Sequence, residues 1–359
     1  MSVEPKNQAL SLTSEAFAEK LVDMLNNGAT IAMIALGHRL GIFDKLDEHG
    51  KCDVGTLAKQ SNLSVCYLEE WLSVMVTAHI VQYEPASQTF ALPESYANCL
   101  CRRASPDNIA VTAQFIPMIC QALPAIEECF KTGEGLPYSA YPCFHQVMSE
   151  DSHQTVVSAI SEHIMPAFEM LHERLSDGCD VLDIGCGKGL GVQELARLYP
   201  NSRFKGYDLC ESVILEARAN AQAQSLTNVQ FECRDATDFD EPESYDVVIT
   251  FDAIHDQADP QGVLNGIKKS LRPDGLYLMQ DIAGSSYLEN NLDHPFAPLI
   301  YSLSCAHCTP VSLHQGGPGL GTMWGQELAM QMLRKAGFNN IEVKHLEHDP
   351  LNMYVMSQA

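Results

Sequence analysis

Basic residues are scarce in this sequence of 359 residues. It holds 22 Lys and Arg against 46 Asp and Glu, which gives a formal net charge of −24 at pH 7. Nucleic-acid binding relies on basic side chains that neutralise many phosphates. The densest basic pairs here are only Arg102-Arg103 and Lys268-Lys269. General DNA or RNA binding is therefore excluded, and we expect no nucleic-acid partner.

Long hydrophobic runs are also missing. No uninterrupted apolar stretch approaches the roughly 18–20 residues that a membrane-spanning helix needs. The first residues lack the basic start and apolar segment of a secretory signal. We therefore expect a cytoplasmic protein without a membrane partner. Its 13 cysteines are scattered along the chain and are expected to be reduced and mostly buried.

Three stretches of different texture follow one another along the chain. Residues 14–100 have a mainly helical pattern with short strands near the end, and residues 107–175 are helical with interruptions by proline. After Gly178, strands and helices alternate, which is typical of a parallel sheet covered by helices. The sequence predicts an α/β protein with three parts: residues 1–105, a helical linker region at 106–175, and residues 176–359.

The first part has the pattern of a winged helix. One amphipathic helix is predicted over residues 29–50, two more over 54–64 and 65–80, and a two-stranded wing over 81–93. A DNA-reading version would present Lys, Arg, Asn or Gln on the recognition helix. Residues 65–80 instead carry Glu69 and Glu70 and no Lys or Arg. A structural or dimerising module is the favoured interpretation.

In the linker region, apolar residues recur every three or four positions and predict a long helix with one apolar stripe. Pro166 lies within it and is expected to kink the helix or split it in two. The stripe consists of Val157, Ile160, Ile164, Phe168, Leu171 and Leu175.

A glycine-rich turn at residues 185–189 follows a short apolar strand and precedes a helix. Glycines at such a turn let a ligand lie against bare backbone, since no Cβ holds it away. The next two predicted strands end at Asp208-Leu209 and Asp235-Ala236, and parallel strands bind ligands at their carboxyl ends. Asp208 is positioned to accept ribose hydroxyls, Asp235 to meet an adenine edge, and Asp183 to take a ligand's amino group.

Two common phosphate-binding fingerprints are absent from this turn. The dinucleotide pattern needs a third glycine, but Leu190 or Val192 occupies that position, depending on the frame. The P-loop ending Gly-Lys-Ser/Thr is missing as well. In addition, the Asp183 carboxylate would repel a pyrophosphate, so a pyridine-nucleotide oxidoreductase is the less favoured alternative.

Five segments in order, VLDIGCGKG, YDL, CRDA, SYDVVITFDAIHD and LRPDGLYLMQDI, resemble the motifs of class I S-adenosylmethionine-dependent methyltransferases over residues 178–359. The front half, with LGIFDKL, is similar to the dimerisation domain of small-molecule O-methyltransferases. The resemblance implies a Rossmann-like domain behind a winged helix, S-adenosyl-L-methionine as cofactor, a small-molecule methyl acceptor and a homodimer. It implies that Gly185, Cys186 and Gly187 abut the methionine part of the cofactor, Asp208 and Leu209 its ribose, Asp235 and Ala236 its adenine, and Phe251 its sulfonium.

His255 and Asp256 follow the fourth strand, where plant O-methyltransferases carry a His-Asp pair whose histidine removes the acceptor's proton. By this resemblance His255 is a candidate base, oriented by Asp256 or Asp252. Imidazole suits this role because its unperturbed pKa of ~6.5 leaves it mostly neutral at pH 7. A capping or surface histidine is the alternative, and Gln257 departs from the aromatic residue that the plant enzymes have there.

The long connection at residues 283–325 is expected to select the acceptor, since most connections are far shorter, roughly 4–6 residues. His314, Met323 and Trp324 are the candidate substrate-binding residues, and an ordinary packed lid is the alternative. Cys305 and Cys308 form a single CxxC without a second pair, so we expect no metal site.

The sequence therefore predicts transfer of a methyl group from S-adenosylmethionine to an O, N or S acceptor on a small molecule. A non-catalytic regulator that senses the cofactor and acts through its winged helix is the alternative from a different class.

Overall fold

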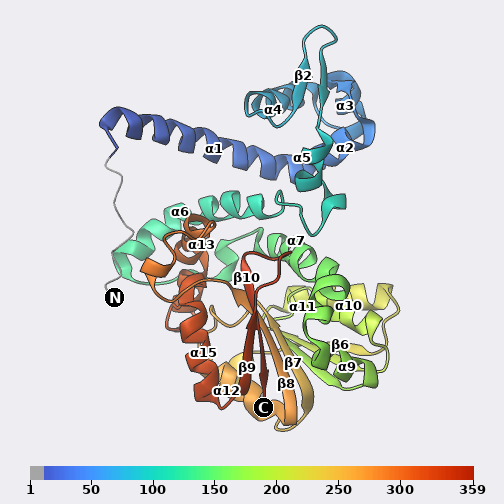
Figure 1. The fold of residues 1–359 in the computed structure, drawn as a ribbon, viewed down its shortest axis with the longest axis vertical. Coiled ribbons are helices and arrows are strands. Elements are labelled where there is room, and N and C mark those ends of the chain that lie inside the picture. The colour runs from blue at the N-terminus through green and yellow to red at the C-terminus, as the bar shows by residue number, and fades with distance from the viewer. Residues whose placement is uncertain (1–11) are drawn as a thin grey trace, which may run out of the picture. The chain divides into compact units, whose positions relative to one another are not determined.

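A computed structural model describes residues 12–359, and the first eleven residues of the predicted first domain lie outside this range. The described chain divides into two compact units (Figure 1). One comprises residues up to Ala104 together with Asn108–Ile116, and the other comprises Ser105–Asp107 and Pro117–Ala359.

The first unit is a winged helix. Its helices are α1 (Ser14–Leu40), α2 (Ile42–His49), α3 (Val54–Ser61), α4 (Val65–Thr77) and α5 (Glu94–Leu100). The wing strands β2 (Gln82–Glu84) and β3 (Thr89–Ala91) join β1 (Cys52–Asp53) in an antiparallel sheet of order β1-β3-β2. The helices predicted over residues 54–64 and 65–80 and the wing predicted over 81–93 are thus confirmed.

The single helix predicted over residues 29–50 is wrong. The helix ends at Gly41, which has a φ of 69°. This residue is the C-cap of α1 and also the N-cap of α2. Only glycine adopts this left-handed conformation without a steric penalty.

The second unit contains a seven-stranded sheet of order β6-β5-β4-β7-β8-β10-β9. The strands β4 to β8 are parallel, whereas β10 runs antiparallel to both β8 and β9. In the β7–β8 pair, Phe251 lies opposite Gln280, and the register is irregular only near Tyr245 and Val247. The strands are β4 (Asp180–Ile184), β5 (Arg203–Asp208), β6 (Val229–Cys233), β7 (Tyr245–Phe251), β8 (Leu271–Ile282), β9 (Asn339–Lys344) and β10 (Asn352–Gln358).

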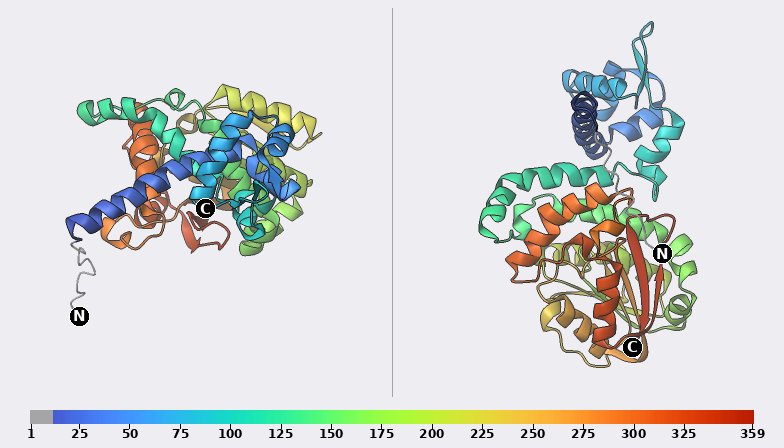
Figure 2. Two further views of the ribbon diagram at one scale, coloured as in Figure 1. Left: turned by 90° about the horizontal axis from the view of Figure 1, so that it is seen from above. Right: turned by 60° about the vertical axis from the view of Figure 1, so that its left-hand side comes forward.

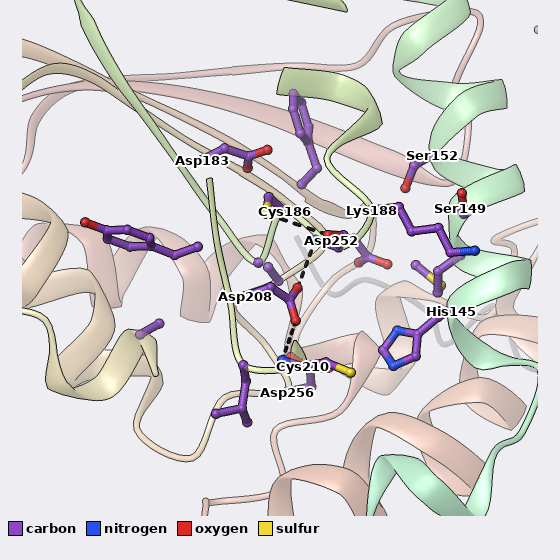
Figure 3. Close-up of a pocket in the computed structure, with 18 of the residues that line it drawn as sticks. His145, Ser149, Ser152, Asp183, Cys186, Lys188, Asp208, Cys210, Asp252 and Asp256 are labelled. Carbon is purple, nitrogen blue, oxygen red and sulfur yellow. Dashed lines mark hydrogen bonds between the residues drawn. The ribbon is translucent and has the colours of Figure 1, made fainter. Parts of the chain in front are cut away.

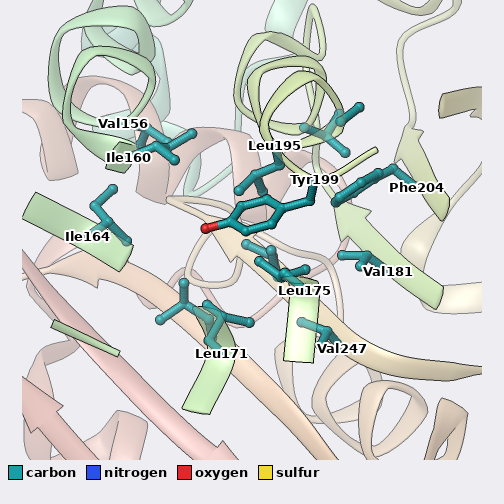
Figure 4. Packing of buried hydrophobic residues seen from close by; sticks show 14 of the residues in the cluster. Val156, Ile160, Ile164, Leu171, Leu175, Val181, Leu195, Tyr199, Phe204 and Val247 are labelled. Carbon is teal, nitrogen blue, oxygen red and sulfur yellow. The ribbon is translucent and has the colours of Figure 1, made fainter. Parts of the chain in front are cut away.

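Helices cover both faces of this sheet, as the Rossmann-like prediction requires. On one face lie α12 (Pro260–Ser270) and α15 (Gly325–Ala336), and on the other α9 (Glu169–Asp177), α10 (Leu190–Leu198) and α11 (Glu211–Ala223) (Figures 1 and 2). Because side chains alternate along a strand, Val181 packs on the α9–α11 face and Leu182 on the α12–α15 face. Figure 4 shows the first of these two cores.

Five of the six residues of the apolar stripe, all but Val157, pack into the core of Figure 4, but their helix is interrupted. Short helical turns at Val157–Ala159, Ile160–Ile164 and Met165–Ala167 precede α9, and Phe168 leaves the helical conformation with φ −129° and ψ 72°. The predicted split around Pro166 is confirmed. No helix within residues 12–359 is long and apolar enough to cross a membrane.

Four further helices of this unit complete the surroundings of the sheet. They are most of α6 (Phe115–Thr132), α7 (Phe144–Thr155), α13 (Ala297–Leu303) and α14 (Thr309–His314), with short turns at Tyr138–Ala140 and Thr322–Trp324.

Candidate functional site

The glycine-rich turn after β4 is held to the neighbouring strand by its own backbone. The amides of Gly185 and Cys186 both donate to the Tyr207 carbonyl, at 2.8 and 2.9 Å. Gly185 and Gly187 have φ values of 75° and 52°, which side chains other than glycine rarely adopt. A Cβ built on Gly187 would meet no atom within 4 Å. Bare backbone therefore borders open space at this point.

That open space is part of a cavity with an interior volume of about 220 Å³ at the carboxyl ends of β4, β5, β6 and β7. Helix α7 contributes residues from a different element, including His145, Ser149 and Ser152 (Figure 3). Every residue that the sequence predicted for cofactor binding lines this cavity, and so does Asp256. The predicted lining residues are Asp183, Gly185, Cys186, Gly187, Asp208, Leu209, Asp235, Ala236, Phe251 and Asp256.

Asp208 fixes the turn as well as lining the cavity. Its Oδ2 accepts from the Gly187 amide at 2.9 Å and its Oδ1 from the Cys210 amide at 2.8 Å. Burial raises the pKa of Asp208, and these two amide donors oppose that shift. The carboxylate is thereby placed at the tip of β5, where it can accept hydrogen bonds from the hydroxyl groups of a ribose.

Asp183 is buried at the end of β4, and its Oδ1 has no hydrogen-bond partner among the described residues. Burial, followed by the negative charge of Asp208, raises the pKa of Asp183 to about 8. A buried carboxyl oxygen without a partner is costly, and a ligand's ammonium group would satisfy it. The site thus fits a ligand with an adenosine and an amino-acid end, as the resemblance implies for S-adenosylmethionine.

His255 lies next to this cavity but does not line it, since its side chain is only 2% exposed. Its Nδ1 donates to Oδ1 of Asp281 at 2.9 Å. Burial by itself lowers the pKa of an imidazole, but the Asp281 carboxylate outweighs this and raises the pKa of His255 well above its usual value.

Asp281 is a residue that sequence reasoning missed. It stands near the end of β8, is fully buried, and also accepts from Trp324 Nε1 at 3.0 Å and from the Ile282 amide at 2.8 Å. The only sequence signal was an acid near the end of an apolar strand next to the strand that precedes His255.

The two aspartates proposed to orient His255 are arranged differently. Asp256 accepts from the Tyr138 hydroxyl at 2.6 Å, whereas Oδ1 of Asp252 lies 3.7 Å from His255 Nδ1. Asp252, His255 and Asp281 each offer a metal-ligand atom, and these atoms lie within 4.8 Å of one another. The 2.9 Å distance from His255 to Asp281 is that of a hydrogen bond, and we interpret the group as a His-Asp pair.

The three candidate substrate-binding residues are not among those that line this cavity. His314 is exposed, Met323 packs beside Gly284, and Trp324 is buried with its indole on Asp281. Sequence reasoning missed the lining residues that come from the linker region and from the long connection at residues 283–325. They are Tyr138, Phe144, His145, Met148, Ser149, Ser152, Val156 and Gln315.

Two protein-family models match the chain. A model described as a methyltransferase domain matches residues 175–337, and one described as an Rv2258c-like winged HTH domain matches residues 28–102.

Curated relatives match part of the chain. The chain is 31% identical over 122 residues to a malonyl-[acyl-carrier protein] O-methyltransferase of Bacillus cereus and 32% identical over 108 residues to a ubiquinone biosynthesis O-methyltransferase of Neisseria meningitidis. These matches cover 33% and 29% of this chain, and it spans 44% of the length of each relative.

Solved structures resemble the whole fold. Human N-acetylserotonin methyltransferase, in complex with S-adenosylmethionine, matches 97% of this chain and 99% of its own with a TM-score of 0.67 and 18% identity. The mitomycin 7-O-methyltransferase MmcR matches 96% of this chain and 98% of its own with a TM-score of 0.67 and 19% identity. At these identities the likeness shows the fold alone.

The sheet order and the glycine turn agree with the family match, so residues 175–337 form a methyltransferase domain with a Rossmann-like fold. A winged HTH domain precedes this domain in the chain, and S-adenosylmethionine is the cofactor of this class of domain.

Proposed function

We propose that this protein transfers a methyl group from S-adenosylmethionine to an O, N or S atom of a small molecule. The observation that carries the proposal is the convergence of the predicted cofactor residues on one cavity at the carboxyl ends of four parallel strands. When bound, S-adenosylmethionine supplies an electrophilic methyl group on a sulfonium. The protein's task is then to align the acceptor with that methyl group and to manage the acceptor's proton.

The proposed cofactor contacts follow from position. Gly185, Cys186 and Gly187 border the methionine part, and Asp183 receives its amino group. Asp208, with Leu209 beside it, holds the ribose. Asp235 and Ala236 lie at the tip of the next strand for the adenine, and Phe251 ends β7 near the sulfonium.

His255 and Asp256 are the proposed catalytic residues. For a hydroxyl or thiol acceptor, His255 would act as the base, with Asp281 fixing its Nδ1 and its ring orientation. Because Asp281 raises the pKa of His255, the share of the neutral, basic form increases with pH above neutrality. The long connection that carries His314, Met323 and Trp324 is proposed to shape the acceptor's binding site.

We further propose a cytoplasmic homodimer that binds no nucleic acid, with a domain organisation of 1–105, 106–175 and 176–359. Helix α1 exposes large apolar side chains that a partner copy would cover, including Leu21, Val22 and Leu25, the last 73% exposed. Helix α4, which a winged-helix regulator would use to read DNA, carries no Lys or Arg. This argues against the regulator alternative.

Calorimetric titration of S-adenosylhomocysteine tests cofactor binding directly. We expect saturable binding that weakens in Asp208→Asn and stays unchanged in Asp238→Asn, an exposed acid of the loop before β7. Incubation with small-molecule extracts and labelled S-adenosylmethionine then tests methyl transfer. A well-folded protein that binds neither the cofactor nor its demethylated product would refute the proposal.

A replacement of His255 by Ala tests the base assignment. Turnover of a hydroxyl acceptor that stays unchanged in His255→Ala from pH 6 to 9 would leave alignment as the sole catalytic contribution.

A further inference from the structure

Carboxyl groups dominate the charged lining of the cavity. Five aspartates line it, and the basic residues that line it besides His145 are Lys188 and Arg234. Lys188 is paired with Glu216 at 2.8 Å and Arg234 with Glu241 at 2.6 Å, and neither glutamate lines the cavity. Burial lowers the pKa of His145, which keeps that imidazole neutral. Each charged basic residue of the lining is therefore already paired with an acid outside the lining. The lining aspartates face the cavity without an unpaired lining cation.

Asp252 is held in place in an unusual conformation. It follows β7 with a φ of 54°, and its amide donates to the Gln280 carbonyl at 2.9 Å. A left-handed conformation is strained for a residue with a Cβ, so the surrounding structure imposes it. Its effect is to direct a carboxylate to the cavity wall immediately after Phe251, the residue proposed to lie near the sulfonium.

The Asp252 carboxylate shares its ion-pair partner, His255, with Asp281. Its Oδ1 is enclosed by protein and makes no hydrogen bond to any described residue. The nearest cation is His255, at 3.7 Å, but that imidazole is hydrogen-bonded to Asp281 at 2.9 Å. Asp281 is itself fully buried, and its Oδ2 is also without a partner among the described residues. One imidazole thus faces two carboxylates, and the exposed part of Asp252, 26% of its side chain, leaves negative charge at the cavity wall that favours a cation there.

Asp256 provides a second carboxylate on the same wall. It lines the cavity with 7% of its surface exposed, and the Tyr138 hydroxyl fixes its Oδ2 at 2.6 Å. Asp252 and Asp256 both follow β7 and both line the cavity, and the charge of Asp256 contributes to raising the pKa of Asp252. Two carboxylates in this arrangement form a site for an ammonium group.

We propose that the methyl acceptor is a basic amine, bound as its ammonium between Asp252 and Asp256 and methylated on nitrogen. The inference rests on the proposed function and names the acceptor atom that the proposed function leaves open. Here His255 is a positioning residue, whose charge offsets part of that of Asp252 and Asp281.

The proposed step balances in protons and electrons. The bound ammonium gives one proton to the Asp252 carboxylate and becomes a neutral amine with a free lone pair. That lone pair forms the new nitrogen–carbon bond while the carbon–sulfur bond breaks and its electron pair remains on sulfur. The products are a methylated ammonium and a neutral thioether. Burial and the charges of Asp281 and Asp256 raise the pKa of Asp252, which suits it to receiving the proton.

A pair of cofactor analogues tests the ammonium site without knowledge of the acceptor. Sinefungin carries an amino group where the methyl group would be transferred, and S-adenosylhomocysteine has no charged group there. We expect the wild-type protein to bind sinefungin at least about tenfold more tightly than S-adenosylhomocysteine. A tenfold difference corresponds to ~1.4 kcal/mol. Asp252→Asn should reduce this ratio to below ~3 while retaining S-adenosylhomocysteine binding, and Asp238→Asn should leave the ratio unchanged. Equal affinities of the two analogues in the wild type would overturn the proposal without any variant.

The products of labelled methyl transfer provide the second test. After incubation with a small-molecule extract, we expect the label in compounds that a cation exchanger retains at pH 4 and at pH 8. Label confined to neutral or anionic compounds would overturn the amine proposal while supporting methyl transfer itself. Absence of S-adenosylhomocysteine binding would instead refute the proposed function, so the two failures are distinguishable.

Discussion

The replacement of Asp281 by Asn is expected to change how stability depends on pH. Asn keeps the shape of the side chain and an oxygen for the indole of Trp324 and the Ile282 amide, but it removes the charge that faces His255. The carboxylate is the largest of the influences that raise the pKa of His255, ahead of Cys308. In the variant, the His255 imidazole is therefore expected to be neutral rather than protonated in the folded protein.

The magnitude follows from burial. Removing one partner of a buried ion pair costs about 3–5 kcal/mol, and the remaining hydrogen bond to an amide returns about 1 kcal/mol. We therefore expect Asp281→Asn to lower the free energy of unfolding by roughly 2–4 kcal/mol at pH 6, where the wild-type pair is charged.

The sign of the pH dependence follows from the direction of the shift. A histidine whose folded pKa lies above its unfolded value of ~6.5 stabilises fully below pH 6.5, and this stabilisation is lost as pH rises through the folded pKa. Within that window the wild type should lose up to about 1.4 kcal/mol per pH unit from His255. Asp183, with its pKa raised to about 8, contributes in the same direction in both proteins and largely cancels in the comparison.

Urea unfolding of the wild type, Asp281→Asn and the exposed control Asp238→Asn from pH 6 to 9 measures the difference. We expect the wild-type and Asp281→Asn curves to converge as pH rises, because the wild type loses the stabilisation that the variant never had. A destabilisation by Asp281→Asn that is constant across the range would show that Asp281 does not hold a proton on His255.

Three further predictions concern the turn, the ribose site and the dimer. Gly185→Ala should lower stability by roughly 2–5 kcal/mol, because its Cβ would lie 2.6 Å from another side chain at a φ of 75°. Gly187→Ala should lower the free energy of unfolding by only ~1–2 kcal/mol, yet bind S-adenosylhomocysteine more weakly in calorimetry. Equal losses of stability in Gly185→Ala and Gly187→Ala would contradict this contrast. Asp208→Asn should reduce that affinity roughly 10–100-fold, or ~1.4–2.7 kcal/mol, and an unchanged dissociation constant would remove Asp208 from the site. Leu25→Asp should shift the protein from dimer to monomer in light scattering at equal concentration, and a mass equal to that of the wild-type dimer would exclude α1 from the interface.

Local patterns accounted for much of the fold. Each strand from β4 to β8 was predicted because an apolar run ends at a turn or an acid, as β4 does at Ile184 and Gly185. Cofactor candidates such as Asp208 were found for the same reason, since strand ends of a parallel sheet converge on one edge. Gly41 was missed as a break because apolar residues continue with helical spacing on both sides of it.

The contacts that define the acceptor side were beyond local patterns. His255 and Asp281 are 26 positions apart and meet only because β7 and β8 are neighbours in the sheet. His145 and Ser149 line the cavity because α7 returns to the strand ends, a placement set by tertiary packing. The left-handed conformation of Asp252 likewise depends on its bond to the Gln280 carbonyl, which no single segment encodes.

The pairing of β7 with β8 limits where residues can be inserted into this chain or deleted from it. A strand presents alternate residues to opposite faces, so one inserted or deleted residue between Leu276 and Asp281 would replace the carboxylate behind His255 by a neighbour from the other side. The same change near the irregular pairing of Tyr245 could be absorbed before the regular register begins. Indels among natural homologues should therefore accumulate at the amino end of β8 and be missing from its last six residues.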